Sequence, residues 1–185
     1  MNYKKNRVCP VEIAGGLDNR FRRWLQNPRK ILKPYIKEGM AVLDFGCGPG
    51  YFTIEIAQMV GKFGRVIAAD LQEGMLQKLR GKIHGIEVES RIALHRSEAN
   101  KIGLSEKVDF ALAFYVVHEI PNQKEFFKEL ESILHPSGQV LVVEPPFHVS
   151  KSAFADTIGK ARDAGLKPAK GPKILFSKTV TLKKG

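Results

Sequence analysis

Three glycines, Gly46, Gly48 and Gly50, fall within five residues of the segment VLDFGCGPG, and Asp44 stands two places before the first of them. Glycines at such a turn let the backbone bend sharply and let a ligand approach the main chain closely. A helix that begins directly after the turn points free N–H groups at an anionic part of that ligand. About twenty residues later the next apolar run ends at Asp70, where a carboxylate can accept hydrogen bonds from a ribose. These residues predict a nucleoside-containing cofactor that carries an anion.

The spacing of the glycines distinguishes this turn from a dinucleotide-binding one. The dinucleotide fingerprint is G-x-G-x-x-G, whereas this chain has G-x-G-x-G with Asp44 in front of it. An acid at this position repels a pyrophosphate but favours a zwitterion whose ammonium lies beside its carboxylate. S-adenosylmethionine has such a pair, together with a sulfonium and a ribose, and is therefore the predicted cofactor.

The elements that position these residues alternate from residue 41 onward. Short apolar runs are separated by segments of helical periodicity, which is typical of a parallel sheet covered on both faces. The predicted strands span residues 41–45, 65–69, 91–95, 108–113, 139–144, 173–176 and 178–183. The predicted helices span residues 51–60, 71–83, 121–135 and 152–164. The last two strands are close enough in the chain to pair antiparallel.

An N-terminal helical arm is predicted over residues 1–38, ahead of a domain over residues 39–185. An apolar stripe at helical spacing is formed by Leu17, Phe21, Trp24 and Leu25. Asn27 and Pro28 then predict the cap and the first turn of a second, short helix. The stripe favours packing against the domain, with contact to a membrane surface as the alternative.

Composition places the chain among ordinary globular proteins. It has 185 residues, of which 43% are hydrophobic and 26% charged, so we expect one folded domain rather than a disordered chain. There is no apolar run of about 18 residues and no apolar segment behind the basic N-terminus, so neither a membrane span nor a secretory signal is predicted. The only cysteines are Cys9 and Cys47, which favours a reduced, cytoplasmic setting. The cysteines and histidines lack metal-ligand spacing, and no metal site is predicted.

The net charge of +11 is concentrated at the two ends of the chain. Residues 1–40 hold ten Lys/Arg and three Asp/Glu, and residues 151–185 hold nine and two, so each segment contributes +7. Residues 41–150 hold eleven and fourteen and contribute −3. Two interpretations are open: the basic segments are solvated surface, or they attract an anionic partner.

Five motifs in order give the chain a family resemblance. They are VLDFGCGPG at 42–50, VIAAD at 66–70, SEA at 97–99, VDFALAFYVVHEI at 108–120 and LHPSGQVLVVE at 134–144. With these motifs the chain resembles the class I S-adenosylmethionine-dependent methyltransferases over roughly residues 40–183. The resemblance implies a three-layer α/β/α Rossmann-like fold. Its seven-stranded, mostly parallel sheet would have the order 3-2-1-4-5-7-6, with strand seven antiparallel.

The resemblance also implies roles for individual residues. Asp44, Gly46 and Gly48 would line the methionine end of the cofactor, and Asp70 would accept the ribose hydroxyls. The remaining implied cofactor contacts are Leu71 and Met75 near the adenine, Glu98 and Ala99 from SEA, and Ala113 and Phe114 near the sulfonium. Glu98 stands where the family usually has an aspartate that binds the adenine amino group.

His118 is the candidate general base. It follows the fourth predicted strand, beside Glu119, where relatives in this family often have a histidine. A base is needed when the methyl acceptor starts out protonated. The alternative is that His118 closes the cofactor pocket or caps the next helix.

A small methyl acceptor, acidic or amphiphilic, is the leading functional hypothesis. The motifs look closest to the small-molecule, type 11 group, which includes quinone-ring methylating enzymes, and imply an enzyme of class EC 2.1.1.-. An RNA or protein methyltransferase that binds an anionic partner through its basic ends is the alternative. A non-enzymatic cofactor-binding module is a third hypothesis. Glu144-Pro145-Pro146-Phe147 resembles the signature of nucleic-acid base methylation, but it follows the fifth predicted strand instead of the fourth and is set aside.

Overall fold

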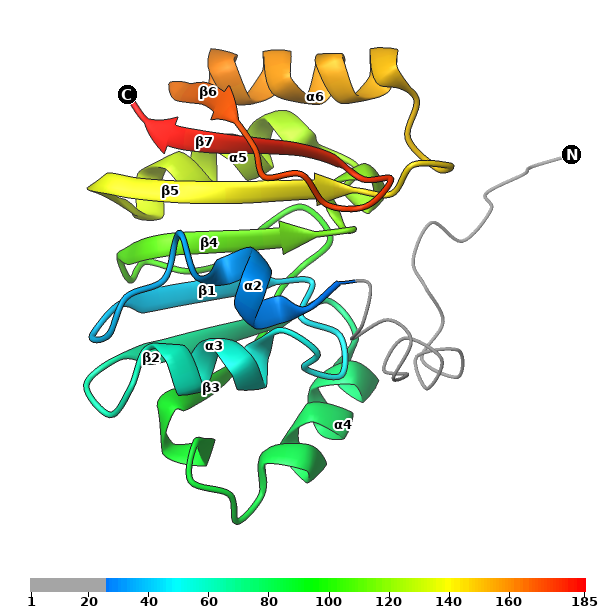
Figure 1. The fold of residues 1–185 in the computed structure, drawn as a ribbon. Helices are drawn as coiled ribbons and strands as arrows, with labels where there is room; N and C mark the ends of the chain where they lie inside the picture. Colours follow the sequence, from blue (N-terminus) through cyan, green and yellow to red (C-terminus); the bar gives the residue numbers. More distant parts are fainter. Residues whose placement is uncertain (1–25) are drawn as a thin grey trace, which may run out of the picture.

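The computed structural model describes residues 26–185, which form a seven-stranded sheet with helices on both of its faces (Figure 1). The strands are β1 (Ala41–Phe45), β2 (Arg65–Asp70), β3 (Ile92–Arg96), β4 (Val108–Phe114), β5 (Leu134–Glu144), β6 (Leu166–Lys170) and β7 (Lys178–Lys184). The helices are α2 (Pro28–Leu32), α3 (Thr53–Met59), α4 (Glu73–Ile83), α5 (Gln123–Ile133) and α6 (Lys151–Asp163). Two short 3-10 helices are η2 (Glu89–Arg91) and η3 (Val117–Glu119).

The strand order is β3-β2-β1-β4-β5-β7-β6. Neighbouring strands are parallel except around β7, which runs antiparallel to β5 and to β6. This confirms the predicted fold class and sheet order. Because β1 and β4 are parallel, their carboxyl ends lie at the same edge of the sheet. Strand order reverses between them, and open α/β sheets bind their ligands in the crevice at that point.

Two apolar clusters fill the spaces between the layers. Alternate residues of each buried strand face opposite sides, so Val42 belongs to the first cluster and its neighbour Leu43 to the second. The first cluster packs α2, α3 and α4 against one face of the sheet, and the second packs α5 and α6 against the other. Helices therefore cover both faces, as the near-continuous apolar strands predict.

The short helix predicted around residues 27 and 28 is confirmed as α2. The side chain of Asn27 accepts a hydrogen bond from the Lys30 N–H at 3.0 Å, and Pro28 is the first helical residue. The predicted apolar stripe from Leu17 to Leu25 lies outside the described residues, and the boundary at residue 38 stays a prediction. Within residues 26–185, none of the helices combines the length and apolar character needed to cross a bilayer.

The predicted strand over residues 173–176 is wrong. The sixth strand is Leu166–Lys170, which starts directly after Gly165, a residue with φ 93° that ends α6. Pro168 weakens the strand pattern of this segment, but β6 is an edge strand, where a missing N–H is tolerated. Residues 173–176 lie instead in the connection between β6 and β7.

Replacing Phe127 with Ala should destabilise the domain by about 3–5 kcal/mol, because this fully buried ring of α5 sits in the second cluster. Urea unfolding followed by circular dichroism measures the effect. Phe63→Ala is the matched control, since that ring is 76% exposed and its loss should leave the unfolding midpoint nearly unchanged. Equal losses in the two variants would contradict this account of the core.

Candidate active site

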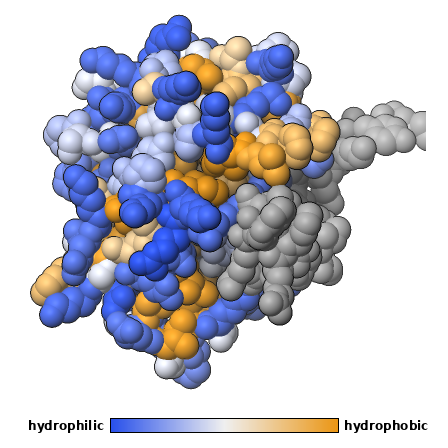
Figure 2. All heavy atoms as spheres, viewed as in Figure 1, coloured by the Kyte–Doolittle hydropathy of each residue, from blue (hydrophilic) through white to orange (hydrophobic). Residues whose placement is uncertain are grey.

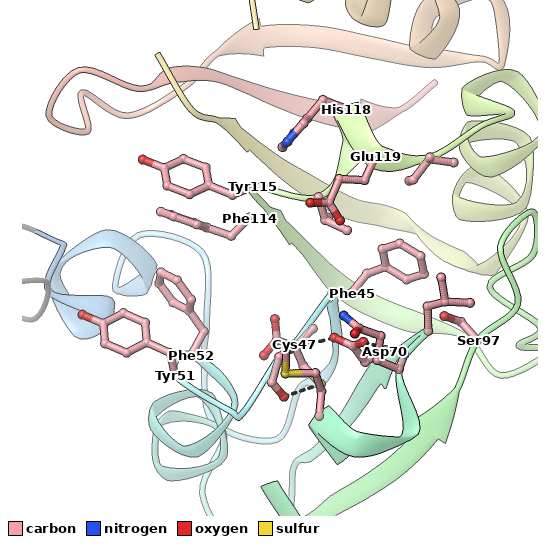
Figure 3. A pocket seen from close by; sticks show the side chains of 18 of the residues that line it. Phe45, Cys47, Tyr51, Phe52, Asp70, Ser97, Phe114, Tyr115, His118 and Glu119 are labelled. Carbon is pink, nitrogen blue, oxygen red and sulfur yellow. Dashed lines mark hydrogen bonds between the residues drawn. The ribbon is translucent and has the colours of Figure 1, made fainter. Parts of the chain in front are cut away.

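A cavity of about 540 Å³ opens at the carboxyl ends of the central strands (Figure 3). Its walls come from the connections that follow β1, β2, β3, β4 and β5. Ten of the eleven predicted site residues line it: Asp44, Gly46, Gly48, Asp70, Leu71, Met75, Glu98, Ala99, Phe114 and His118. The eleventh, Ala113, packs in the second apolar cluster, one residue before the Phe114 side chain that forms part of the wall.

The glycine turn has the backbone conformation that its sequence predicts. Gly46, Gly48 and Gly50 have φ angles of 73°, 53° and 86°, which are unfavourable for residues with a Cβ atom. A Cβ atom on Gly46 would lie 2.6 Å from the Val116 side chain, whereas one on Gly48 would meet no atom within 4 Å. Gly46 is therefore needed for packing, and Gly48 presents bare backbone to the cavity.

The predicted helix start at residue 51 is wrong by two residues. Helix α3 begins at Thr53, whose hydroxyl donates a hydrogen bond of 2.6 Å to Asp44 Oδ2. The rings of Tyr51 and Phe52 consequently lie in the turn and line the cavity. The Asp44 carboxylate is thus held from the following helix.

Two buried carboxylates flank the turn. Asp44 is 2% exposed, and its burial raises the pKa of its carboxyl to about 7, despite the Thr53 hydrogen bond and with help from the charge of Asp70. Asp70 is 8% exposed and accepts the N–H groups of Gly48 at 2.9 Å and Gln72 at 2.8 Å. Burial raises its pKa as well, although these hydrogen bonds oppose the shift. A ligand with positive charge next to the turn relieves the cost of burying both groups.

The segment after β3 forms the wall of the cavity on the side of Asp70. Ser97, Glu98 and Ala99 line the cavity there, and the Ser97 N–H donates to the Asp70 carbonyl at 3.1 Å. The Ser97 hydroxyl is the one buried side-chain nitrogen or oxygen atom of residues 26–185 that has no hydrogen-bond partner. Ser97 is the first residue of the SEA motif, of which only Glu98 and Ala99 were predicted to contact the cofactor.

An aromatic wall forms the opposite end, where Figure 3 shows Tyr51, Phe52, Phe114 and Tyr115 grouped away from Asp70 and Ser97. The ring centroids of Phe52 and Phe114 are 4.4 Å apart, and those of Phe114 and Tyr115 are 4.5 Å apart. Tyr115 has a φ of 61°, and its hydroxyl hydrogen-bonds Ser177 at 2.6 Å and Gln26 at 2.7 Å. The cavity therefore has a charged, polar end and an apolar, aromatic end.

His118 lines the cavity above this aromatic end and is hydrogen-bonded to a buried carboxylate. Its Nδ1 lies 2.6 Å from Glu144 Oε2, and its backbone N–H donates to Glu144 Oε1 at 3.0 Å. Burial alone lowers the pKa of His118, but the hydrogen bond and charge of Glu144, with the charge of Glu119, raise it above its ordinary value. With Nδ1 as donor to Glu144, the imidazole presents Nε2 as a proton acceptor.

Glu144 is a second residue of the site that the sequence did not predict. It is fully buried at the end of β5, and β5 is the parallel neighbour of β4, whose following turn contains His118. The ends of adjacent parallel strands meet at one edge, so this strand-end acid could have been paired with His118. Within the described residues, no group of three or more acidic, histidine or cysteine side chains is placed to hold a metal ion.

Comparison with known proteins gives consistent matches. A family model described as a methyltransferase domain matches residues 36–165. A demethylmenaquinone methyltransferase of Bacillus cereus is 25% identical over 125 residues, which cover 68% of this chain and 52% of the relative. One of Lactobacillus johnsonii is 30% identical over 122 residues, which cover 65% of this chain and 49% of the relative. The chain spans about half the length of these curated relatives.

Solved structures extend the likeness to almost the whole chain. A SAM-dependent methyltransferase from Aquifex aeolicus superposes with a TM-score of 0.83 at 25% identity, covering 95% of this chain and 97% of the other. A TehB-like SAM-dependent methyltransferase from Corynebacterium glutamicum gives a TM-score of 0.73 at 14% identity, with coverages of 95% and 100%, and shows the fold alone.

The raised pKa of Asp44 should make the ligand-free protein less stable as pH rises. The folded carboxyl titrates near pH 7 and the unfolded one near 3.8, so the folded state holds a proton that unfolding releases between these values. Stability is therefore lost as pH rises through this range, by on the order of 4 kcal/mol. Asp44→Asn, which retains an oxygen for Thr53, lacks this component. Urea unfolding of both proteins between about pH 4 and pH 8 measures it, and parallel pH profiles would contradict it.

Proposed function

The chain belongs to the methyltransferase-domain family, and on that premise we propose that it transfers a methyl group from S-adenosylmethionine to a small-molecule acceptor. The observation that supports this most directly is the pair of buried carboxylates, Asp44 and Asp70, beside the bare backbone of Gly48. S-adenosylmethionine has two positive charges, an amino-acid end and a ribose, so it fits a site that disfavours a pyrophosphate.

The residues of the polar end would hold this cofactor. Asp70 has lone pairs left for ribose hydroxyls after it accepts two backbone N–H groups, because a carboxylate can accept about four hydrogen bonds. Asp44 and Gly48 would face the methionine end. Met75, Leu71 and Glu98 would surround the adenine, together with the buried Ser97 hydroxyl. When bound, S-adenosylmethionine supplies an electrophilic methyl group on a positively charged sulfur.

The aromatic end would then hold the acceptor. Rings of Tyr51, Phe52 and Phe114 exclude water from one side of the cavity and leave an apolar surface suited to a planar or aliphatic group. Holding the two reactants in line can lower the barrier by several kcal/mol without any acid or base. The names of the relatives from Bacillus cereus and Lactobacillus johnsonii support a small-molecule acceptor.

His118 would act as the general base when the acceptor atom carries a proton. Its Nε2 would take the proton while the acceptor atom bonds to the methyl carbon, whose bond to sulfur breaks and leaves a neutral thioether. Glu144 would keep the imidazole in the required tautomer and stabilise the imidazolium that forms. Because Glu144 acts through His118, it is a positioning residue.

Asp70→Ala should weaken S-adenosylmethionine binding by about 1–3 kcal/mol, since a buried hydrogen-bonding partner of the ribose is lost. Isothermal titration calorimetry measures this directly. Asp156→Ala is the control, because that carboxylate is exposed on α6 and pairs with Lys160. NAD serves as the ligand that should not bind. Unchanged affinity in Asp70→Ala, or retention of NAD in place of S-adenosylmethionine, would contradict the assignment.

His118→Gln should reduce methyl transfer by about 10²- to 10⁴-fold. The assay uses methyl-labelled S-adenosylmethionine with a panel of phenols, quinols, amines and carboxylates, and tRNA as the macromolecular alternative. Transfer to tRNA alone would refute a small-molecule acceptor.

Glu144→Gln should move the acid limb of the pH–rate profile to lower pH, because it removes the negative charge that raises the pKa of His118. If Glu144 were purely structural, the substitution would lower the rate at every pH without moving that limb.

A further inference from the structure

Three exposed apolar side chains, which we call the apolar rim, lie at the carboxyl end of β5. Phe147 is 91% exposed, Phe176 is 74% exposed and Leu175 is 48% exposed. Phe147 belongs to the connection between β5 and α6, and the other two belong to the connection between β6 and β7. Large apolar side chains that gather at one exposed place usually mark an interaction site.

The sheet brings the two connections together. β5 and β7 are antiparallel neighbours with Glu144 opposite Lys178, so the residues that follow one strand lie beside those that precede the other. The Lys178 ammonium donates to the Pro146 carbonyl at 3.2 Å and joins the two connections. Both connections reach the same edge of the molecule in Figure 1, where Figure 2 shows apolar atoms at the surface.

The surroundings of the apolar rim are basic. Lys151, Lys170 and Lys173 are exposed on its flanks, and Lys178 is half-buried beside it. Residues 145–151 and 164–185 contain no aspartate or glutamate, so no acid within these segments offsets the lysines. Protruding aromatic and aliphatic side chains surrounded by lysines match the chemistry of an anionic bilayer surface, with apolar tails beneath negative headgroups.

The apolar rim also borders the mouth of the cavity. Pro145 and His148, on either side of the Pro146-Phe147 pair, line the cavity. The Tyr115 hydroxyl of the aromatic wall is hydrogen-bonded to Ser177, the residue after Phe176. A surface that contacts the apolar rim therefore faces the aromatic end of the cavity.

We propose that the apolar rim docks the protein on an anionic lipid surface and places the aromatic end of the cavity toward the bilayer. An amphiphilic molecule could then reach the cavity from the membrane without crossing water. The lysines alone would suit the phosphates of a nucleic acid as well as those of lipids, so the exposed side chains of Phe147, Leu175 and Phe176 are what favour a bilayer as the partner. The docking itself does not depend on methyl transfer.

Co-sedimentation of the full chain with vesicles tests the docking, without cofactor or acceptor. Wild type should sediment with phosphatidylcholine–phosphatidylserine vesicles and much less with phosphatidylcholine alone. Phe147→Ser combined with Phe176→Ser should reduce the partition coefficient at least about tenfold, because two aromatic side chains no longer enter the interface. Lys170→Glu combined with Lys173→Glu should abolish the preference for the anionic vesicles.

Phe63→Ser is the matched control, because Phe63 is about as exposed as Phe176 and lies beside Lys62, between α3 and β2. This variant should sediment as wild type does. All variants carry an unchanged residue 1–40 segment, so a contribution from its basic residues is common to them. Thermal unfolding by circular dichroism establishes that each variant is folded. Unchanged sedimentation of the double phenylalanine variant would overturn the proposal. The proposal would also be overturned if the double phenylalanine variant kept vesicle binding but lost self-association in size-exclusion chromatography. Loss of tRNA binding with vesicle binding retained would overturn it in the same way.

Discussion

The hydrogen bond between the Asp70 carboxylate and the Gly48 N–H is the interaction on which the site depends. It holds the glycine turn after β1 against the end of β2, and the Gly46 and Cys47 N–H groups donate to the Ala69 carbonyl on the same side. The acid that shapes the turn is also the one whose burial favours a cationic, hydroxyl-rich ligand. The conformation of the glycine turn and the preference of the site for a cationic ligand therefore both depend on Asp70.

Much of the fold could be predicted because its central strands are buried on both faces. β1, β2 and β4 are near-continuous apolar runs that contain Asp44, Asp70 and Asp109, and their ends lie within one residue of the predicted bounds. The segment 173–176 has as many apolar residues as a strand, yet it lies in a connection. Residues 166–170 form the strand because they pair with β7, whereas residues 173–176 do not. The amino-acid composition of a short segment does not reveal which strand it pairs with.

The polar end of the site was more predictable than the part that contains His118. Asp44, the glycines and Asp70 sit at fixed positions relative to two strands, so spacing alone locates them. The contact between His118 and Glu144 joins residues 26 apart on neighbouring strand ends, and only the order of the sheet brings them together. Ala113 shows the converse: one residue along a pleated strand turns a side chain from the cavity into the core.

One edge of the sheet is formed by β6, which pairs with β7 on one side and, within residues 26–185, has no strand on the other. It contains Pro168 between Lys167 and Lys170. Proline presents no N–H to an incoming strand, and lysines repel a second basic edge. Pro168 and these lysines therefore make β6 a poor template for β-pairing between molecules, which protects the lysine-rich β6–β7 hairpin from aggregation.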